Sequence, residues 1–145
     1  MAEVLHLFVA FVHRQPMQEV AEVAAVPDKG FAGCIHGRPG SKRQVLLMDV
    51  ETLQTLGVEP GHVKENITTR GLNVQELTQG QRVRVGEALL EVTGPCGPCN
   101  LMNEVRPGLE QELRGRRGTL CRVLEGGRIR RGDRVEVLEP AVAPI

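Results

Sequence analysis

Aromatic residues are nearly missing from this sequence, which has three Phe and neither Trp nor Tyr among its 145 residues. Proteins that bind single-stranded nucleic acid stack the bases on aromatic side chains, so we expect no nucleic-acid partner. Net charge is missing as well, because 18 Lys and Arg balance 18 Asp and Glu. A chain without net charge has no general attraction to nucleic acid or to a membrane surface.

Membrane-spanning and export signals are also missing. The apolar run 4–12 contains His6 and is too short to cross a bilayer. The first three residues lack the basic character that opens a secretory signal. We therefore expect a cytoplasmic protein without a membrane partner, in which the four cysteines are reactive or metal-binding rather than joined in disulfides.

Length and composition predict one domain over residues 1–145. With 41% apolar residues, a chain of this size can bury a sizeable core. The tail 140–145 is the one stretch whose composition suggests disorder.

Strand patterns dominate the chain. Alternating or compact apolar runs predict strands over 4–12, 18–23, 43–50, 82–85, 88–93, 119–124 and 134–139. Short helices are expected over 51–56, 100–105 and 108–114. The segments 80–87 and 126–133 resemble each other, and each reads as a strand leading to a Gly-acidic turn. We predict a mostly β fold, a closed or partly open β-barrel with a few short helices.

Arginine is concentrated near the end of the chain. Eight arginines lie between Arg114 and Arg134, where the only acidic residues that accompany them are Glu125 and Asp133. This excess could hold an anion such as a phosphate. The simpler interpretation is a solvated strand face.

The segment 94–99, Gly-Pro-Cys-Gly-Pro-Cys, carries the clearest chemical signal. Pro95 and Pro98 stiffen the backbone before each cysteine. Cys99 is expected at the start of a helix, whose amide groups favour negative charge and can lower a thiol pKa. Cys99 is therefore the candidate nucleophile, and Cys96 is its candidate resolving neighbour.

Three interpretations of this cysteine pair remain open. A thiol–disulfide exchanger has this spacing, but the surroundings are strand-rich and no aromatic residue precedes Cys96. A structural zinc site would need Cys96 and Cys99 together with Cys34, His36 or Cys121, and the sequence has no second CxxC. The third interpretation is a single functional thiol, Cys99, at the mouth of an anion-binding pocket, with the other two cysteines packed in the core.

Four segments of the chain carry a resemblance to a known family. They are His36-Gly37 with Arg-Gln-Val-Leu-Leu at 43–47, Glu-Asn-Ile-Thr-Thr-Arg-Gly-Leu at 65–72, Thr-Gly-Pro-Cys-Gly-Pro-Cys at 93–99, and the glycine- and arginine-rich stretch 115–133. In this order, and over about residues 33–137, they resemble the MOSC family, the C-terminal domain of molybdenum cofactor sulfurases that also occurs as small stand-alone bacterial proteins.

The resemblance implies a barrel-like β fold and a functional thiol at Cys99, which in the family is thought to carry a persulfide or to face the molybdenum of a pterin cofactor. Nothing resembles the desulfurase half of the large sulfurases, so no pyridoxal phosphate is expected. A pterin cofactor is a large anion that needs amides, hydroxyls and arginines. The expected cofactor-binding residues are Asn66, Thr68, Thr69, Arg70, His36, Arg116 and Arg117. The alternative for 66–70 is a polar turn that bonds its own backbone.

The leading hypothesis is therefore a molybdenum-cofactor-related sulfur carrier or cofactor-binding module. Cys99 would be its reactive thiolate or metal ligand, and a sulfurtransferase-type activity is one form that it could take. The expected partner is a cysteine desulfurase or a molybdoenzyme. A second hypothesis is a module that holds the finished cofactor and supports reduction of N-hydroxylated compounds. A third is a zinc-stabilised or thiol-redox domain.

Overall fold

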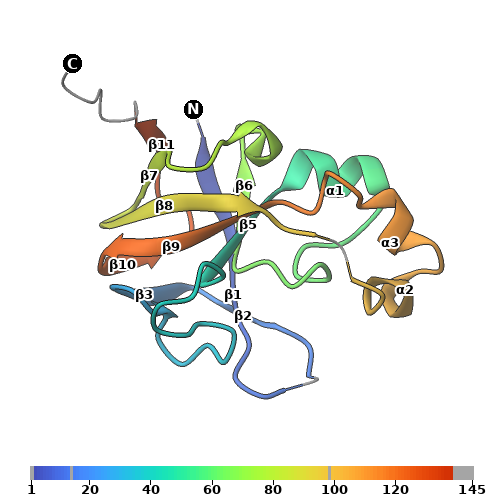
Figure 1. The fold of residues 1–145 in the computed structure, drawn as a ribbon, viewed down its shortest axis with the longest axis horizontal. Coiled ribbons are helices and arrows are strands. Elements are labelled where there is room, and N and C mark those ends of the chain that lie inside the picture. The colour runs from blue at the N-terminus through green and yellow to red at the C-terminus, as the bar shows by residue number, and fades with distance from the viewer. Residues whose placement is uncertain (1, 14, 98, 139–145) are drawn as a thin grey trace.

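The computed structural model describes residues 2–13, 15–97 and 99–138 (Figure 1). Pro98 and the tail 140–145, both of which figure in the sequence predictions, lie outside these residues. The strands are β1 (Glu3–Val9), β2 (Gln18–Val20), β3 (Glu22–Val26), β4 (Gly30–Phe31), β5 (Val45–Asp49), β6 (Ile67–Arg70), β7 (Arg82–Val85), β8 (Ala88–Pro95), β9 (Thr119–Glu125), β10 (Gly127–Arg130) and β11 (Val135–Leu138). The helices are α1 (Val50–Leu56), the 3₁₀ turn η1 (Val74–Glu76), α2 (Met102–Val105) and α3 (Leu109–Glu112).

The strands form two sheets. The larger has the order β11-β7-β8-β9-β5-β6-β1-β2, and the smaller has the order β10-β3-β4. The large sheet is mixed, because β5 and β6 run parallel whereas its other described pairs are antiparallel. A single bridge between Glu3 and Arg134 brings the start of β1 close to β11. The mostly β fold with few helices is confirmed, whereas the described strands do not close the sheet into a barrel.

The clearest error of the sequence prediction concerns residues 66–70, which were expected to form a loop. Residues Ile67–Arg70 are instead strand β6, placed between β1 and β5 within the large sheet. Ile67, Thr68 and Thr69 are β-branched and favour extended backbone, and all three are buried. The hydroxyl groups of Thr68 and Thr69 made a buried strand look like a polar turn.

Other expected elements differ in length, among them the helix expected over 108–114, which is α3 at Leu109–Glu112, and the strand expected over 4–12, which is β1 at Glu3–Val9. The expected strand 18–23 is interrupted at Ala21 and becomes β2 and β3. The helix expected over 100–105 shortens to the single turn α2, and Cys99 lies three residues before it. Among the described residues, no helix has the length and apolar character needed to cross a membrane.

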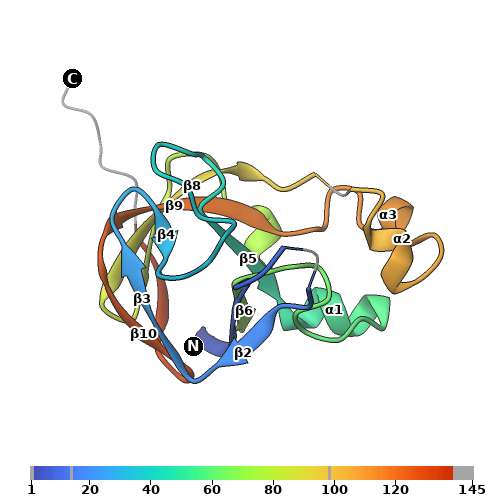
Figure 2. The same cartoon turned by 90° about the horizontal axis from the view of Figure 1, so that it is seen from below.

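Two apolar clusters form the core. The larger lies between the sheets, and it includes Leu7, Phe31 and Leu90. The smaller joins β5 to the helices, with Met48, Leu53, Met102, Leu109 and Leu113 among its members. In both Figure 1 and Figure 2 the three α-helices lie together at one end of the large sheet, away from β3 and β10. Cys99 packs against this smaller cluster, which fixes the position of the cysteine segment.

The arginine excess near the end of the chain is offset by acidic residues from other strands. Arg122 pairs with Glu91 at 2.8 Å. Further pairs join Arg128 and Arg130 to Glu22, Arg131 to Glu19 and Arg134 to Glu136. These exposed pairs each contribute little to stability. Together they support the solvated-face interpretation for the arginines within 122–134.

Candidate functional site

A cleft of about 1460 Å³ lies beside α2. Its walls come from four separate parts of the chain: the segment after β1, residues 35–46, residues 60–66 and residues 96–105, with Arg117 and Leu120 added from the segment before and at the start of β9. Cys96 and Cys99 both line it. The proline-stiffened cysteine segment therefore opens into the largest recess described here.

The lining of this basic cleft is strongly cationic in a protein without net charge. Among the described residues that line the cleft, Glu104 is the single acidic one. None of the cleft's Lys and Arg side chains has a carboxylate within 4.0 Å among the described residues. Unpaired cations in a recess with low-dielectric walls attract anions. The basic residues of the cleft are Arg38, Arg43, Lys64, Arg117, His13, His36 and His62.

The pKa of His36 reflects both its burial and the positive charge around it. Desolvation lowers its pKa most, and the neighbouring charges of Lys64, His13, Arg117 and Arg43 lower it further. The imidazole therefore stays neutral to a lower pH than an ordinary histidine. A neutral ring can donate one hydrogen bond and accept another, so His36 can orient a ligand that the cations attract.

The two cleft cysteines have different environments. Cys99 is partly exposed, and its carbonyl accepts a hydrogen bond from the Met102 amide at 3.0 Å. Cys96 is only 4% exposed, and the Arg43 guanidinium approaches its sulfur with Nη2 at 3.9 Å. Cys99 is thus the thiol that a ligand can reach directly, whereas Cys96 is recessed beside a cation.

Arg117 joins the two loops that carry the cleft's chemistry. Its Nη1 donates to the carbonyl of Gly97 at 2.9 Å, and its Nη2 donates to the carbonyl of Val63 at 3.1 Å. The side chain is buried, and Nε has no partner among the described residues. Arg117 therefore holds the cysteine segment against the loop that presents His62 and Lys64. The neighbouring Arg116 does not line the cleft, because its guanidinium bonds the Glu112 carbonyl at the surface.

Asn66 lines the cleft, but strand contacts use its amide. Its Oδ1 accepts from the Leu46 amide at 3.0 Å, and its Nδ2 donates to the Phe8 carbonyl at 3.2 Å. The side chain thus joins β5 to β1 beneath the cleft floor. A third contact, from Nδ2 to Cys34 Sγ at 3.5 Å, completes its surroundings.

Three other expected ligands of segment 66–70 lie away from the cleft. Thr68 is buried and donates to the Glu65 carboxyl at 2.8 Å. Thr69 is buried on the other side of β6. Arg70 is exposed and pairs with Glu3 at the start of β1. Of the expected site residues, the structure brings together Cys96, Cys99, Asn66, His36 and Arg117, and it separates Thr68, Thr69, Arg70 and Arg116 from them.

Sequence analysis missed Arg38, Arg43, Lys64, His13 and His62. Arg43 and Lys64 had a usable signal, because Arg43 opens one segment that resembles the family and Lys64 directly precedes another. Lys64 also has a positive φ of 68°, which is uncommon for a residue other than glycine. Composition does not predict this backbone conformation. His13 and His62 had no local signal, since only the tertiary fold brings them to the cleft.

Cys34 and Cys121 belong to the large core cluster, as expected. Complete burial raises the pKa of the Cys121 thiol far above its usual value. The residues described here contain no group of three or more His, Cys, Asp or Glu placed to hold one metal ion. The zinc alternative therefore gains no ligand set from these cysteines.

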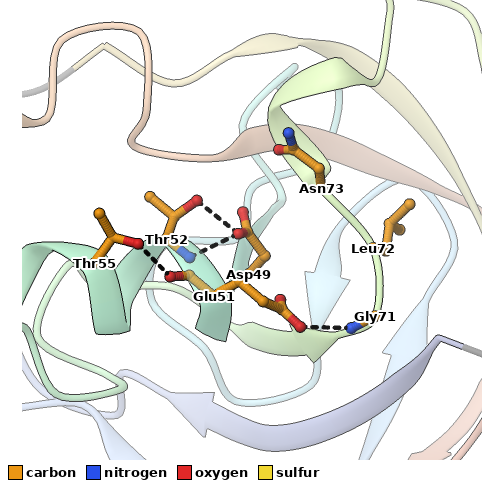
Figure 3. Close-up of a pocket in the computed structure, with 7 residues that line it drawn as sticks. All are labelled: Asp49, Glu51, Thr52, Thr55, Gly71, Leu72 and Asn73. Atoms are coloured by element: carbon orange, nitrogen blue, oxygen red, sulfur yellow. Dashed lines mark hydrogen bonds between the residues drawn. The ribbon is translucent and has the colours of Figure 1, made fainter.

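A second, smaller pocket of about 330 Å³ lies at the start of α1 (Figure 3). Its polar groups are already occupied: Asp49 accepts from the Thr52 amide at 2.9 Å, and Glu51 accepts from the Gly71 amide at 2.9 Å. It holds neither a cysteine nor a basic residue. These contacts explain the pocket as the capped end of a helix.

Known proteins resemble this chain in fold. The YuaD protein of Bacillus subtilis superposes with a TM-score of 0.82 at 21% identity, covering 94% of both chains. YiiM from Geobacillus stearothermophilus has a TM-score of 0.73 at 21% identity and covers 96% of this chain and 76% of its own. YiiM from Escherichia coli has a TM-score of 0.72 at 21% identity, with 100% and 73% covered. None of the curated proteins searched matches the sequence.

The family comparison covers the segments that build the cleft, which are residues 35–46, residues 60–66 and the cysteine segment. A family model, the MOSC domain, matches residues 35–136 and so spans all three segments. Members of that family are generally associated with functions related to the molybdenum cofactor. This chain belongs to the MOSC domain family.

Proposed function

We propose that this protein binds the molybdenum cofactor in the basic cleft, with Cys99 as the thiol that meets the metal. The observation that carries the proposal is the set of unpaired cations around a partly exposed cysteine. Such a donor set fits an anionic pterin that carries both a phosphate and a metal with affinity for sulfur. The cleft volume of about 1460 Å³ is also ample for a ligand of that size.

Each cleft residue has a separate part in this proposal. Arg38, Arg43 and Lys64 would hold the anionic groups, since none of them has a carboxylate within 4.0 Å among the described residues. His36, kept neutral by its surroundings, would orient a polar edge of the pterin. Cys99 would supply a sulfur ligand, and the bound group would supply redox chemistry that the side chains lack. Arg117 would hold the cysteine segment next to the loop that carries Lys64.

Sulfur transfer is the second candidate function, and the accessibility of Cys99 favours it. A persulfide forms when a thiolate attacks the outer sulfur of a donor persulfide and displaces the donor's thiolate, so an exposed thiol is needed. Cys96 lies in the same cleft, and its thiolate could later attack Sγ of the Cys99 persulfide, which would form a Cys96–Cys99 disulfide and release hydrosulfide. In this version the partner is a cysteine desulfurase; in the cofactor version it is a molybdoenzyme.

The test is the molybdenum and pterin content of protein purified from a host that makes the cofactor. Wild type is expected to contain both in equal amounts. Lys64→Glu is expected to lose most of both, because it reverses an unpaired charge in the cleft. Cys99→Ser is expected to lower the molybdenum content more than the pterin content, because only the metal loses a ligand.

Arg84→Glu is the matched control. Arg84 is exposed and pairs with Glu125 outside the cleft, so its charge reversal should leave the cofactor content unchanged. Equal losses in Lys64→Glu and Arg84→Glu would mean that overall charge, and not this cleft, governs binding. Wild type without pterin would refute the proposal. Mass spectrometry after incubation with a desulfurase and cysteine separates the second candidate, which requires added sulfur on Cys99.

A further inference from the structure

The rim of the basic cleft is apolar and exposed. Among the described residues, the large hydrophobic side chains with high exposure are Phe11 at 47%, Val12 at 58%, Leu101 at 56%, Val105 at 40% and Val137 at 36%. Val12, Leu101 and Val105 line the cleft, and Phe11 is the chain neighbour of Val12. Exposed apolar side chains that gather beside polar groups mark interaction surfaces.

The rim is held in place by the core. Met102 is 1% exposed and anchors α2 in the smaller cluster, which leaves Leu101 and Val105 facing outward. On the other side, the Ile35 amide donates to the Ala10 carbonyl at 2.8 Å and ties the segment after β1 to the next wall of the cleft. The ring of Phe11 lies over Gly33, which precedes that wall in the chain. The apolar side chains are therefore presented by fixed backbone.

The charge and the volume of the cleft indicate which kind of partner can occupy it. The recess behind the rim is cationic and contains one carboxylate, so it complements acidic groups. Its volume of about 1460 Å³ exceeds the 300–1,000 Å³ that is typical of small-molecule sites, so a protein segment can enter it beside a bound cofactor. A flat anionic bilayer cannot reach recessed groups such as Arg117, which is 6% exposed. A protruding protein segment can reach into the recess.

We infer that the apolar rim and the basic cleft together form the docking surface for an acidic segment of a partner protein. Its carboxylates would enter the cleft, and its apolar side chains would pack on Val12, Leu101 and Val105. This inference rests on the proposed function, because the partner would deliver or receive the group held at Cys99. Docking would also shield Cys99 from water.

Fluorescence anisotropy tests the inference with a fluorescein-labelled peptide in which Glu residues surround a central Leu pair. Wild type is expected to bind this peptide and not its counterpart with Lys in place of Glu. The double variant Leu101→Ser with Val105→Ser is expected to bind about tenfold more weakly, the size of loss typical of apolar anchors. Bound peptide is expected to slow alkylation of Cys99 by N-ethylmaleimide.

Val137→Ser is the matched control, because it removes an exposed apolar side chain on β11, outside the cleft. An equal loss of affinity in this control would overturn the inference, as would binding of the Lys peptide or binding of phosphatidylglycerol vesicles in place of the acidic peptide. Cofactor content, measured separately, keeps the two proposals apart. Wild type that loads cofactor without binding peptide defeats the docking surface alone, and wild type that binds peptide without loading cofactor defeats the proposed function alone.

Discussion

Replacing Arg117 with Met should destabilise the fold and weaken the contact between the cysteine segment and the loop that presents Lys64. The substitution keeps most of the buried aliphatic length but removes the hydrogen bonds to the carbonyls of Gly97 and Val63. A hydrogen bond from a charged donor contributes about 1.5–3 kcal/mol, so the two together stabilise the fold by about 3–6 kcal/mol. The unpaired Nε already costs about 1–2 kcal/mol, which the substitution removes. The expected net loss is therefore about 2–4 kcal/mol.

Thermal unfolding gives the first measurement of this prediction. For a chain of this size, about 2–4 °C of Tm accompanies each kcal/mol, so Tm should fall by about 4–16 °C. Arg116→Met is the matched control and should change stability by less than about 1 kcal/mol, because Arg116 is exposed. The second measurement is the alkylation rate of Cys99, which should rise in Arg117→Met once Gly97 is released. Equal Tm values and equal alkylation rates in the two variants would refute the role given to Arg117.

Three further predictions concern single groups. N-ethylmaleimide with peptide mapping should label Cys99 before Cys96 and leave Cys34 and Cys121 unlabelled until denaturant is added; early labelling of Cys121 would contradict its burial. The lowered pKa of His36 means that the unfolded chain binds more protons, so stability should fall as pH drops below about 6.5, and His36→Gln should flatten that slope. Burial raises the pKa of Glu65, so the folded protein loses stability as pH rises above about 4.5, the ordinary pKa of a glutamate. Glu65→Gln should therefore be more stable than wild type at pH 8 by denaturant unfolding, and a less stable variant would contradict this assignment.

The fold could be predicted where sequence pattern and burial agree. Strand β7 alternates charged and apolar residues because one face meets the core, and its predicted bounds match those observed. Strand β6 could not be predicted in the same way, since its buried hydroxyls resemble a surface turn. The position of Arg70 at the end of that strand, beside Glu3, follows from pairing with β1 and from nothing local.

The candidate site was predictable in part. The proline-rich segment predicts a presented thiol, and Cys99 does line the cleft, as do the expected residues His36, Asn66 and Arg117. The cleft cations that the sequence did not predict come from segments more than 30 residues away from Cys99. Of the arginines concentrated near the end of the chain, those within 122–134 are in ion pairs, whereas Arg117 lines the cleft. The fold decides which cations form ion pairs and which line the cleft, and local composition does not predict this.

X-ray absorption at the molybdenum edge of the cofactor-loaded protein tests the central claim most directly. Wild type should show a sulfur ligand that is lost in Cys99→Ser and kept in Cys96→Ser, because Cys99 is the accessible thiol of the basic cleft. Identical spectra for wild type and Cys99→Ser would contradict the account.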